Sequence, residues 1–128
     1  RVRELAGDDS IVDQQSAMEE MVRRARDCRT AERAVLMAHA FVQGATISDS
    51  ERALSVGGAA TIAASVFEGF HYVALGHLHR PQSVGGGGID GERVQYAGSL
   101  LKYSKSEIGH DKSVTVIEIR CVFTLRSA

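Results

Sequence analysis

The sequence has little of what a small nucleic-acid-binding or disulfide-linked module needs. It contains two cysteines, one proline and no tryptophan, and its formal net charge is −1. Cys28 and Cys121 form no CxxC pair, so neither a zinc knuckle nor a thioredoxin-like motif is present. The balanced charge argues against a small basic DNA-binding module, although an enzyme can still grip phosphates locally through metal ions.

Long apolar stretches are also missing. No run approaches the roughly 20 residues of a membrane helix, and the amino terminus has no signal-peptide pattern. We therefore expect a cytoplasmic protein in a reducing setting, without membrane contact. The length of 128 residues suits one domain or part of one. Because the chain begins with Arg1 and continues with polar residues, we expect an internal piece of a longer polypeptide.

The periodicity of apolar residues predicts an α/β fold. Helical spacing predicts a helix over residues 11–28 with Asp9 or Ser10 as its N-cap, and its arginine-rich end predicts a solvated face rather than a phosphate site. Apolar runs predict buried strands over residues 34–38 and from Tyr72 onward. The remaining predictions are a site-lining loop over 44–58, a glycine-tipped hairpin over 82–96, and strands over 113–119 and 121–126.

Two histidines stand at the carboxyl end of the Tyr72 strand. Residues i and i+2 of an extended strand point to the same side, so His77 and His79 should project together. Gly76 before them permits close backbone approach or an unusual dihedral angle. Two surface histidines are the alternative interpretation, but the position after a buried strand favours a metal site.

A third histidine, His39, follows the predicted strand over 34–38. A single histidine there is more often structural, whereas a multi-metal centre gathers ligands from several strand ends. His71 is interpreted as structural or exposed. Two metal ions about 3.5–4 Å apart can clamp the attacking and leaving oxygens of a phosphoryl transfer. Such a centre also needs oxygen ligands, and Asp49, Asp90 and Asp111 lie in predicted loops without strand-end context.

An ordered series of motifs makes the metal interpretation more specific. The motifs are VLMAH (35–39), SDSER (48–52), SVGG (55–58), FEGF (67–70), YVALGHLH (72–79), YAGS (96–99) and KYS (102–104). Together they resemble the carboxy-terminal half of the phosphoesterase domain of the SbcD family, the nuclease subunits of bacterial SbcCD complexes in the calcineurin-like metallophosphoesterase superfamily. The resemblance covers roughly residues 31–119.

The resemblance implies a site, a cofactor and partners. His39 and His77 would bind one metal and His79 the other, usually manganese, with magnesium or another divalent ion as alternatives. Ser99, Lys102 and Tyr103 would lie near the substrate. The parent protein would be a DNA exonuclease and endonuclease of DNA repair, recombination and replication. It would act as a homodimer within a heterotetramer that contains an SbcC-like ATPase.

The chain departs from the family pattern in two ways. Leu100 and Lys105 stand where the family usually has a proline and an aromatic residue, so the local loop shape should differ. The family's earlier DxH, GD and GNH motifs, which supply further ligands and the general acid, are missing from these residues and are expected upstream. We therefore predict a partial layered sandwich, the carboxy-terminal half of one domain, that is inactive alone. The alternatives are a phosphoesterase for another phosphodiester and a non-catalytic scaffold with structural histidines.

Overall fold

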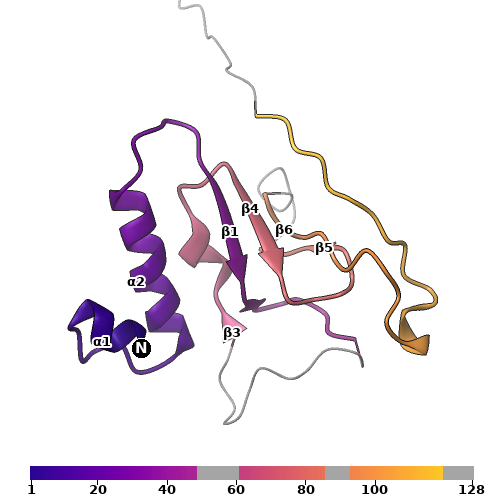
Figure 1. Ribbon diagram of the computed structural model, residues 1–128, viewed down its shortest axis with the longest axis horizontal. Coiled ribbons are helices and arrows are strands. Elements are labelled where there is room, and N and C mark those ends of the chain that lie inside the picture. Colours follow the sequence, from indigo (N-terminus) through magenta and orange to yellow (C-terminus); the bar gives the residue numbers. More distant parts are fainter. Residues whose placement is uncertain (49–60, 86–92, 120–128) are drawn as a thin grey trace, which may run out of the picture.

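The computed structural model describes residues 1–48, 61–85 and 93–119, which form a mixed α/β arrangement with few helices (Figure 1). This confirms the predicted α/β class at the coarse level. The helical elements are α1 (Val2–Ala6), α2 (Gln14–Asp27) and the 3₁₀ helices η1 (Ala64–Phe67) and η3 (Lys105–Glu107). The strands are β1 (Val35–His39), β2 (Phe41–Val42), β3 (Thr61–Ile62), β4 (Tyr72–Gly76), β5 (Gln82–Ser83) and β6 (Val94–Tyr96).

The main sheet has the strand order β1-β4-β6-β5. β1, β4 and β6 are parallel, so their carboxyl ends lie at one edge of the sheet, and the last residue of β1, His39, is level with Gly76 (Figure 1). β5 pairs antiparallel with β6, which confirms the predicted hairpin, while its glycine-rich tip lies outside the described residues. β2 and β3 form a separate parallel pair.

The core lies between the main sheet, η1 and α2. Its most completely buried side chains are Val42, Phe67, Val73 and Tyr96. The phenol of Tyr96 donates to the backbone oxygen of Ala40 at 2.7 Å and accepts from the amide of Val42 at 2.9 Å. Because both hydrogen bonds satisfy a buried hydroxyl, they fix β6 against the chain that leaves the end of β1.

Helix α2 begins three residues later than predicted, at Gln14, with Asp13 rather than Asp9 or Ser10 as its N-cap. The Asp13 carboxylate accepts from the Ser16 amide at 2.7 Å, and the Ser16 hydroxyl accepts from the Asp13 amide at 3.2 Å. This reciprocal capping box gives hydrogen-bond partners to two backbone amides that the first turn of the helix would otherwise leave unsatisfied. It therefore determines where the helix starts.

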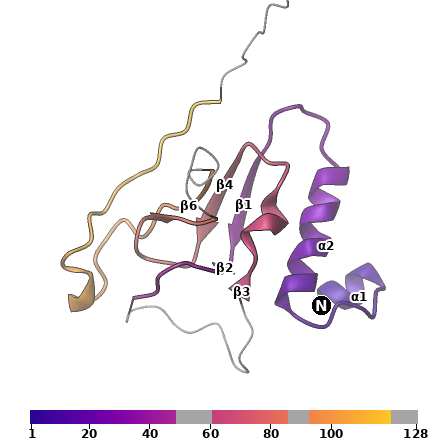
Figure 2. The ribbon, with the colours of Figure 1, turned by 180° about the vertical axis from the view of Figure 1, so that it is seen from behind.

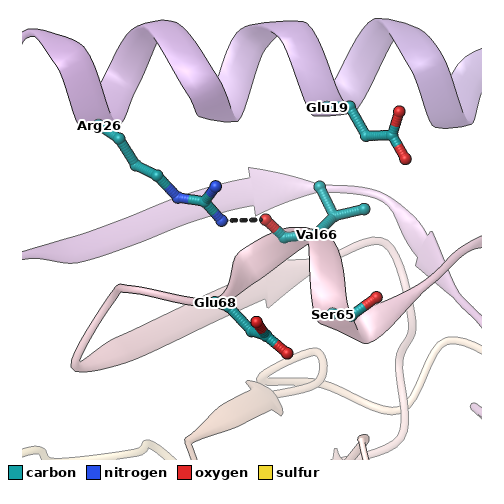
Figure 3. A pocket seen from close by; sticks show the side chains of 5 residues that line it. All are labelled: Glu19, Arg26, Ser65, Val66 and Glu68. Atoms are coloured by element: carbon teal, nitrogen blue, oxygen red, sulfur yellow. Dashed lines mark hydrogen bonds between the residues drawn. The ribbon is translucent and has the colours of Figure 1, made fainter.

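The arginines of α2 are used within the fold. Arg23 and Arg24 pair with the carboxylate of Glu20, while Arg26 donates to the backbone oxygen of Val66 at 2.7 Å and joins α2 to η1 (Figure 3). Arg29 similarly donates to the oxygen of Gly69 at 2.8 Å. Arg23 and Arg24, 58% and 49% exposed, agree with the predicted solvated face, whereas Arg26 and Arg29 instead tie α2 and the residues after it to the segment 66–69.

Acidification should reduce the stability of α2 through Glu20. Hydrogen bonds from Arg23 and Arg24 lower the pKa of Glu20 from 4.5 to about 2. A folded-state pKa below the unfolded value means that the stabilisation is complete above pH 4.5 and is lost as the pH falls toward 2. We expect the acid loss of helical circular dichroism in this window to be smaller in Glu20→Gln than in the wild type. Glu4→Gln, which changes an exposed carboxyl in α1, should keep the wild-type profile; equal profiles for all three proteins would contradict this account.

The strand predicted over residues 113–119 needs correction. The described residues 111–119 form no strand, although residues 113–119 alternate in the manner of one. Val114 and Val116 are 72% and 90% exposed, because this segment runs along the flank of the sheet opposite α2 without pairing to a neighbour (Figures 1 and 2). Alternation alone does not make a strand, since a strand also needs a partner for its backbone groups. The strand predicted over 121–126 lies outside the described residues.

β1 is less buried than its apolar sequence predicts. Leu36 and Ala38 are partly buried and pack on the core, whereas Val35 and Met37 are 44% and 83% exposed. A continuous apolar run predicts a strand covered on both faces, but the described residues cover only one face of β1. Within residues 1–48, 61–85 and 93–119, no helix has the length and apolar character that crossing a membrane requires.

Candidate metal centre

His39 and His77 lie together at the carboxyl ends of β1 and β4. His39 is the last residue of β1, and His77 directly follows β4. Their ring centroids are 5.3 Å apart, with the ring planes at 74°. The ring of Phe41 lies 6.4 Å from that of His77 and supplies an apolar neighbour. Adjacent parallel strands therefore place two imidazoles at the same edge of the sheet, as the sequence predicted from their positions.

The backbone conformation at His77 differs from the prediction. β4 ends at Gly76, and His77 adopts a φ of 109°, so His77 and His79 are not alternate residues of one extended strand. The period-two argument for a shared orientation is therefore wrong. A non-glycine residue at such a φ costs on the order of 1–3 kcal/mol, and conformations of this kind gather at functional sites, where the surrounding structure imposes them.

Gly76 allows the close approach on which the pair depends. A Cβ atom built on Gly76 would lie 3.0 Å from Nδ1 of His39 and 3.9 Å from the backbone oxygen of Ala38. Any larger residue would push the His39 ring away from its present place. Of the two properties expected for Gly76, the structure shows the close approach, while the unusual dihedral angle falls on His77.

His79 has different surroundings. Its Nδ1 lies 3.0 Å from Oε1 of Glu107, and its ring centroid is 5.4 Å from that of Tyr103. Across the described ranges, no group of three or more His, Cys, Asp or Glu side chains is arranged to hold a metal ion. The structure thus brings His39 and His77 together, and it places His79 against Glu107 and Tyr103.

A buried charged network that the sequence did not predict lies beside His79. Glu107 is fully buried, and the ammonium of Lys112, 10% exposed, lies 2.6 Å from Oε2 of its carboxylate. Lys112 also donates to the hydroxyl of Ser99 at 2.8 Å and to the backbone oxygen of His79 at 2.9 Å. No apolar pattern or motif marked either residue, because both stand in a polar stretch that is typical of a surface loop.

Two of the three residues expected near the substrate lie beside His79. The amide of Ser99 donates to the backbone oxygen of His79 at 3.1 Å, and the ring of Tyr103 flanks the imidazole. Lys102 instead donates to the backbone oxygen of Ile108 within its own loop. His71, expected to be structural or exposed, is exposed, and its Nδ1 accepts from the amide of Ala34 at 3.4 Å.

One surface hollow lies on the main sheet beside His39, and another lies between α2 and η1. An open groove on the uncovered face of the sheet is lined by Met37, Ala38, His39, Ala74, Leu75 and Gly76. The hollow between α2 and η1 is lined by Glu19, Arg26, Ser65, Val66 and Glu68 (Figure 3). The first is lined by one candidate metal ligand, His39, whereas in the second the guanidinium of Arg26 already donates to the backbone oxygen of Val66.

The residues present fit part of a divalent-metal site. Two imidazoles at adjacent strand ends are suitable donors for a transition-metal ion, and the space that Gly76 leaves empty preserves their approach. Asp111 is exposed in a loop, and Asp49 and Asp90 lie outside the described residues, as do most of SDSER and all of SVGG. Compared with the known protein families, the chain matches no family model.

Proposed function

We propose that this chain is the carboxy-terminal half of the phosphoesterase domain of an SbcD-like nuclease subunit, which hydrolyses phosphodiester bonds in DNA through a two-metal centre. The observation that carries the proposal is the pairing of His39 with His77, whose rings lie 5.3 Å apart at the ends of adjacent parallel strands. The motif series described above supplies the substrate class, because strand-end histidines alone do not select DNA over another phosphodiester.

In this proposal the three histidines divide between two ions. His39 and His77 would hold one ion through imidazole nitrogens, and His79 would hold the other. When bound, manganese ions would polarise a phosphoryl oxygen and make a water nucleophilic near neutral pH. Phe41 gives His77 an apolar neighbour, while Glu107 and Ser99 hold His79. The further ligands and the general acid come from the DxH, GD and GNH motifs of the parent polypeptide.

The proposed partners follow from the same assignment. The parent protein acts on DNA in the cytoplasm as a homodimer, joined to an SbcC-like ATPase in a heterotetramer that serves repair and recombination. With a net charge of −1, this chain offers no general electrostatic attraction for DNA. Bound metals would supply a local positive charge for contact with the phosphate backbone near this half of the domain.

A non-catalytic scaffold is the second candidate. It is favoured by the observation that the described residues gather no group of three or more potential metal-binding side chains. Under this alternative, His39 and His77 pack as aromatic neighbours, and His79 is a structural partner of Glu107.

The chain by itself should not cleave DNA. It supplies at most three imidazole ligands and no general acid, so we expect manganese-dependent hydrolysis of linear duplex DNA to equal that of His77→Ala. The intact parent polypeptide should cleave the same DNA and lose that activity on His77→Ala. The measurement is release of acid-soluble nucleotides with and without Mn²⁺. Cleavage by this chain above the His77→Ala control would contradict the proposal, and an inactive parent with a normal fold would favour the scaffold.

A further inference from the structure

Glu107 is the one buried charged side chain that the described part of the chain contains. It stands at the end of η3, between exposed neighbours, and yet its side chain has no exposed surface. Removing a carboxylate from water costs several kcal/mol unless charges and hydrogen bonds compensate. The burial of Glu107 therefore depends on the groups that contact its carboxylate, because the polar sequence of its own loop would favour an exposed side chain.

Nitrogen atoms of three described residues surround the Glu107 carboxylate. The ammonium of Lys112 is 2.6 Å from Oε2, the amide of Tyr103 is 3.3 Å from the same oxygen, and Nδ1 of His79 is 3.0 Å from Oε1. Lys112 has three N–H donors, and they face Glu107, Ser99 and the backbone oxygen of His79. The ammonium of Lys112 stabilises the negative charge of the Glu107 carboxylate, and all three of its donors are used within this network.

An ionised carboxylate only accepts hydrogen bonds, which decides the state of the His79 ring. Because Oε1 of Glu107 has no proton to give, Nδ1 of His79 must be the donor. In the neutral imidazole the proton then sits on Nδ1, and Nε2 keeps its lone pair. Histidine ligands of metals commonly donate their second ring N–H to a carboxylate in this way, which fixes the tautomer and the orientation of the ring.

The same network also fixes the backbone of His79. Its carbonyl oxygen accepts from Lys112 at 2.9 Å and from the amide of Ser99 at 3.1 Å. His79 is consequently held at both ends, by Glu107 at the ring and by Lys112 at the backbone, although it follows the strand and lies in no regular element. These hydrogen bonds restrict the motion of His79 although it lies on an irregular segment. A metal site whose ligands are already held in place binds its ion more tightly.

We propose that Glu107 and Lys112 form a positioning pair that holds His79 in its Nδ1–H tautomer and presents Nε2 to a metal ion. The presentation of Nε2 rests on the proposed function, whereas the tautomer follows from the negative charge of Glu107 and its contact with Nδ1 of His79. Glu107 and Lys112 bind no ion or substrate themselves and act through His79.

The test is the tautomer of His79 in the metal-free chain, read from ¹⁵N chemical shifts and ring N–H couplings after histidine labelling. The signal is assigned by its loss in His79→Gln. The wild type should show a protonated Nδ1 and an unprotonated Nε2. In Glu107→Gln, the amide oxygen must face the donor Lys112, which turns the amide NH₂ toward His79. Nδ1 then becomes an acceptor, and the tautomer should invert to Nε2–H.

A control variant and a binding measurement complete the experiment. Glu32→Gln, which neutralises an exposed carboxylate before β1, should leave the His79 tautomer unchanged. Titration calorimetry with Mn²⁺ should show affinity reduced by about 10–100-fold in Glu107→Gln relative to the wild type and to Glu32→Gln. A wild-type His79 with its proton on Nε2, or protonated on both nitrogens at neutral pH, overturns the proposal, as does a folded Glu107→Gln that keeps the Nδ1–H tautomer.

The two readouts separate this inference from the proposed function. Suppose that the wild type has the Nδ1–H tautomer, that Glu107→Gln inverts it, and that the wild type binds no Mn²⁺. The positioning of the His79 ring is then supported, and the proposed metal function is wrong. If the wild type binds Mn²⁺ but carries the Nε2–H tautomer, the proposed role of Glu107 and Lys112 is wrong and the proposed metal function is supported.

Discussion

Replacing Lys112 with methionine should lower the free energy of unfolding by about 3–5 kcal/mol, the usual cost of removing one partner from a buried ion pair. Methionine keeps most of the side-chain volume but leaves the fully buried Glu107 carboxylate without its ammonium partner. It also removes donors from Ser99 and from the backbone oxygen of His79. The measurement is urea denaturation followed by circular dichroism, with the stability obtained by linear extrapolation.

Lys105→Met is the matched control. Lys105 is exposed in η3, so the same chemical change there should alter stability by no more than about 0.5 kcal/mol. Combining Lys112→Met with Glu107→Leu removes both charges and should recover part of the loss, because no buried charge is then unpaired. If Lys112→Met is as stable as Lys105→Met, the buried ion pair does not exist in solution.

Gly98→Ala should lower the free energy of unfolding by about 2–4 kcal/mol, the sum of an unfavourable backbone and a steric clash. Gly98 has a φ of 79°, and a Cβ atom there would lie 2.7 Å from the backbone oxygen of His79 and 2.8 Å from Cδ of Pro81. A backbone oxygen and a proline ring cannot swing away as a flexible side chain can. The substitution should therefore also displace the backbone of His79, detectable as a shift of its imidazole NMR signals.

Two other glycines separate the contributions. Gly44 has a φ of 87°, and a methyl group added there would meet nothing within 4 Å, so Gly44→Ala measures the cost of the backbone alone, about 1–2 kcal/mol. Gly109 has neither a left-handed φ nor a near neighbour, and Gly109→Ala should be close to neutral. Equal losses for Gly98→Ala and Gly44→Ala would show that the His79 oxygen is not where the structure places it.

The parts of the fold that the sequence predicted well are those set by apolar runs. The runs ending at His39 and Gly76 became the paired strands β1 and β4, and the helical spacing over 11–28 became α2. Such patterns report burial directly. The strand predicted over 113–119 was wrong because pairing depends on a neighbouring strand, which local alternation does not encode.

The candidate site was predictable only in part, for a related reason. The positions of His39 and His77 after apolar runs were enough to place them at one edge of the sheet. The φ of His77 was not predictable, since its neighbours impose it. Glu107 was missed because its burial depends on His79, 28 residues earlier in the chain, and on Lys112; a charged residue in a polar stretch otherwise indicates a surface loop.

The central claim is that His39 and His77 jointly hold a divalent metal, and titration calorimetry with MnCl₂ on five proteins tests it most directly. These are the wild type, His39→Ala, His77→Ala, Gly76→Ala and the control His71→Ala, whose exposed imidazole lies outside the pair. We predict weak binding by the wild type and by His71→Ala, and at least about tenfold weaker binding by His39→Ala and by His77→Ala, because each loses an inner ligand. Gly76→Ala should also bind less tightly, since its methyl group displaces the His39 ring. Mn²⁺ binding that is the same in all five proteins would contradict the account.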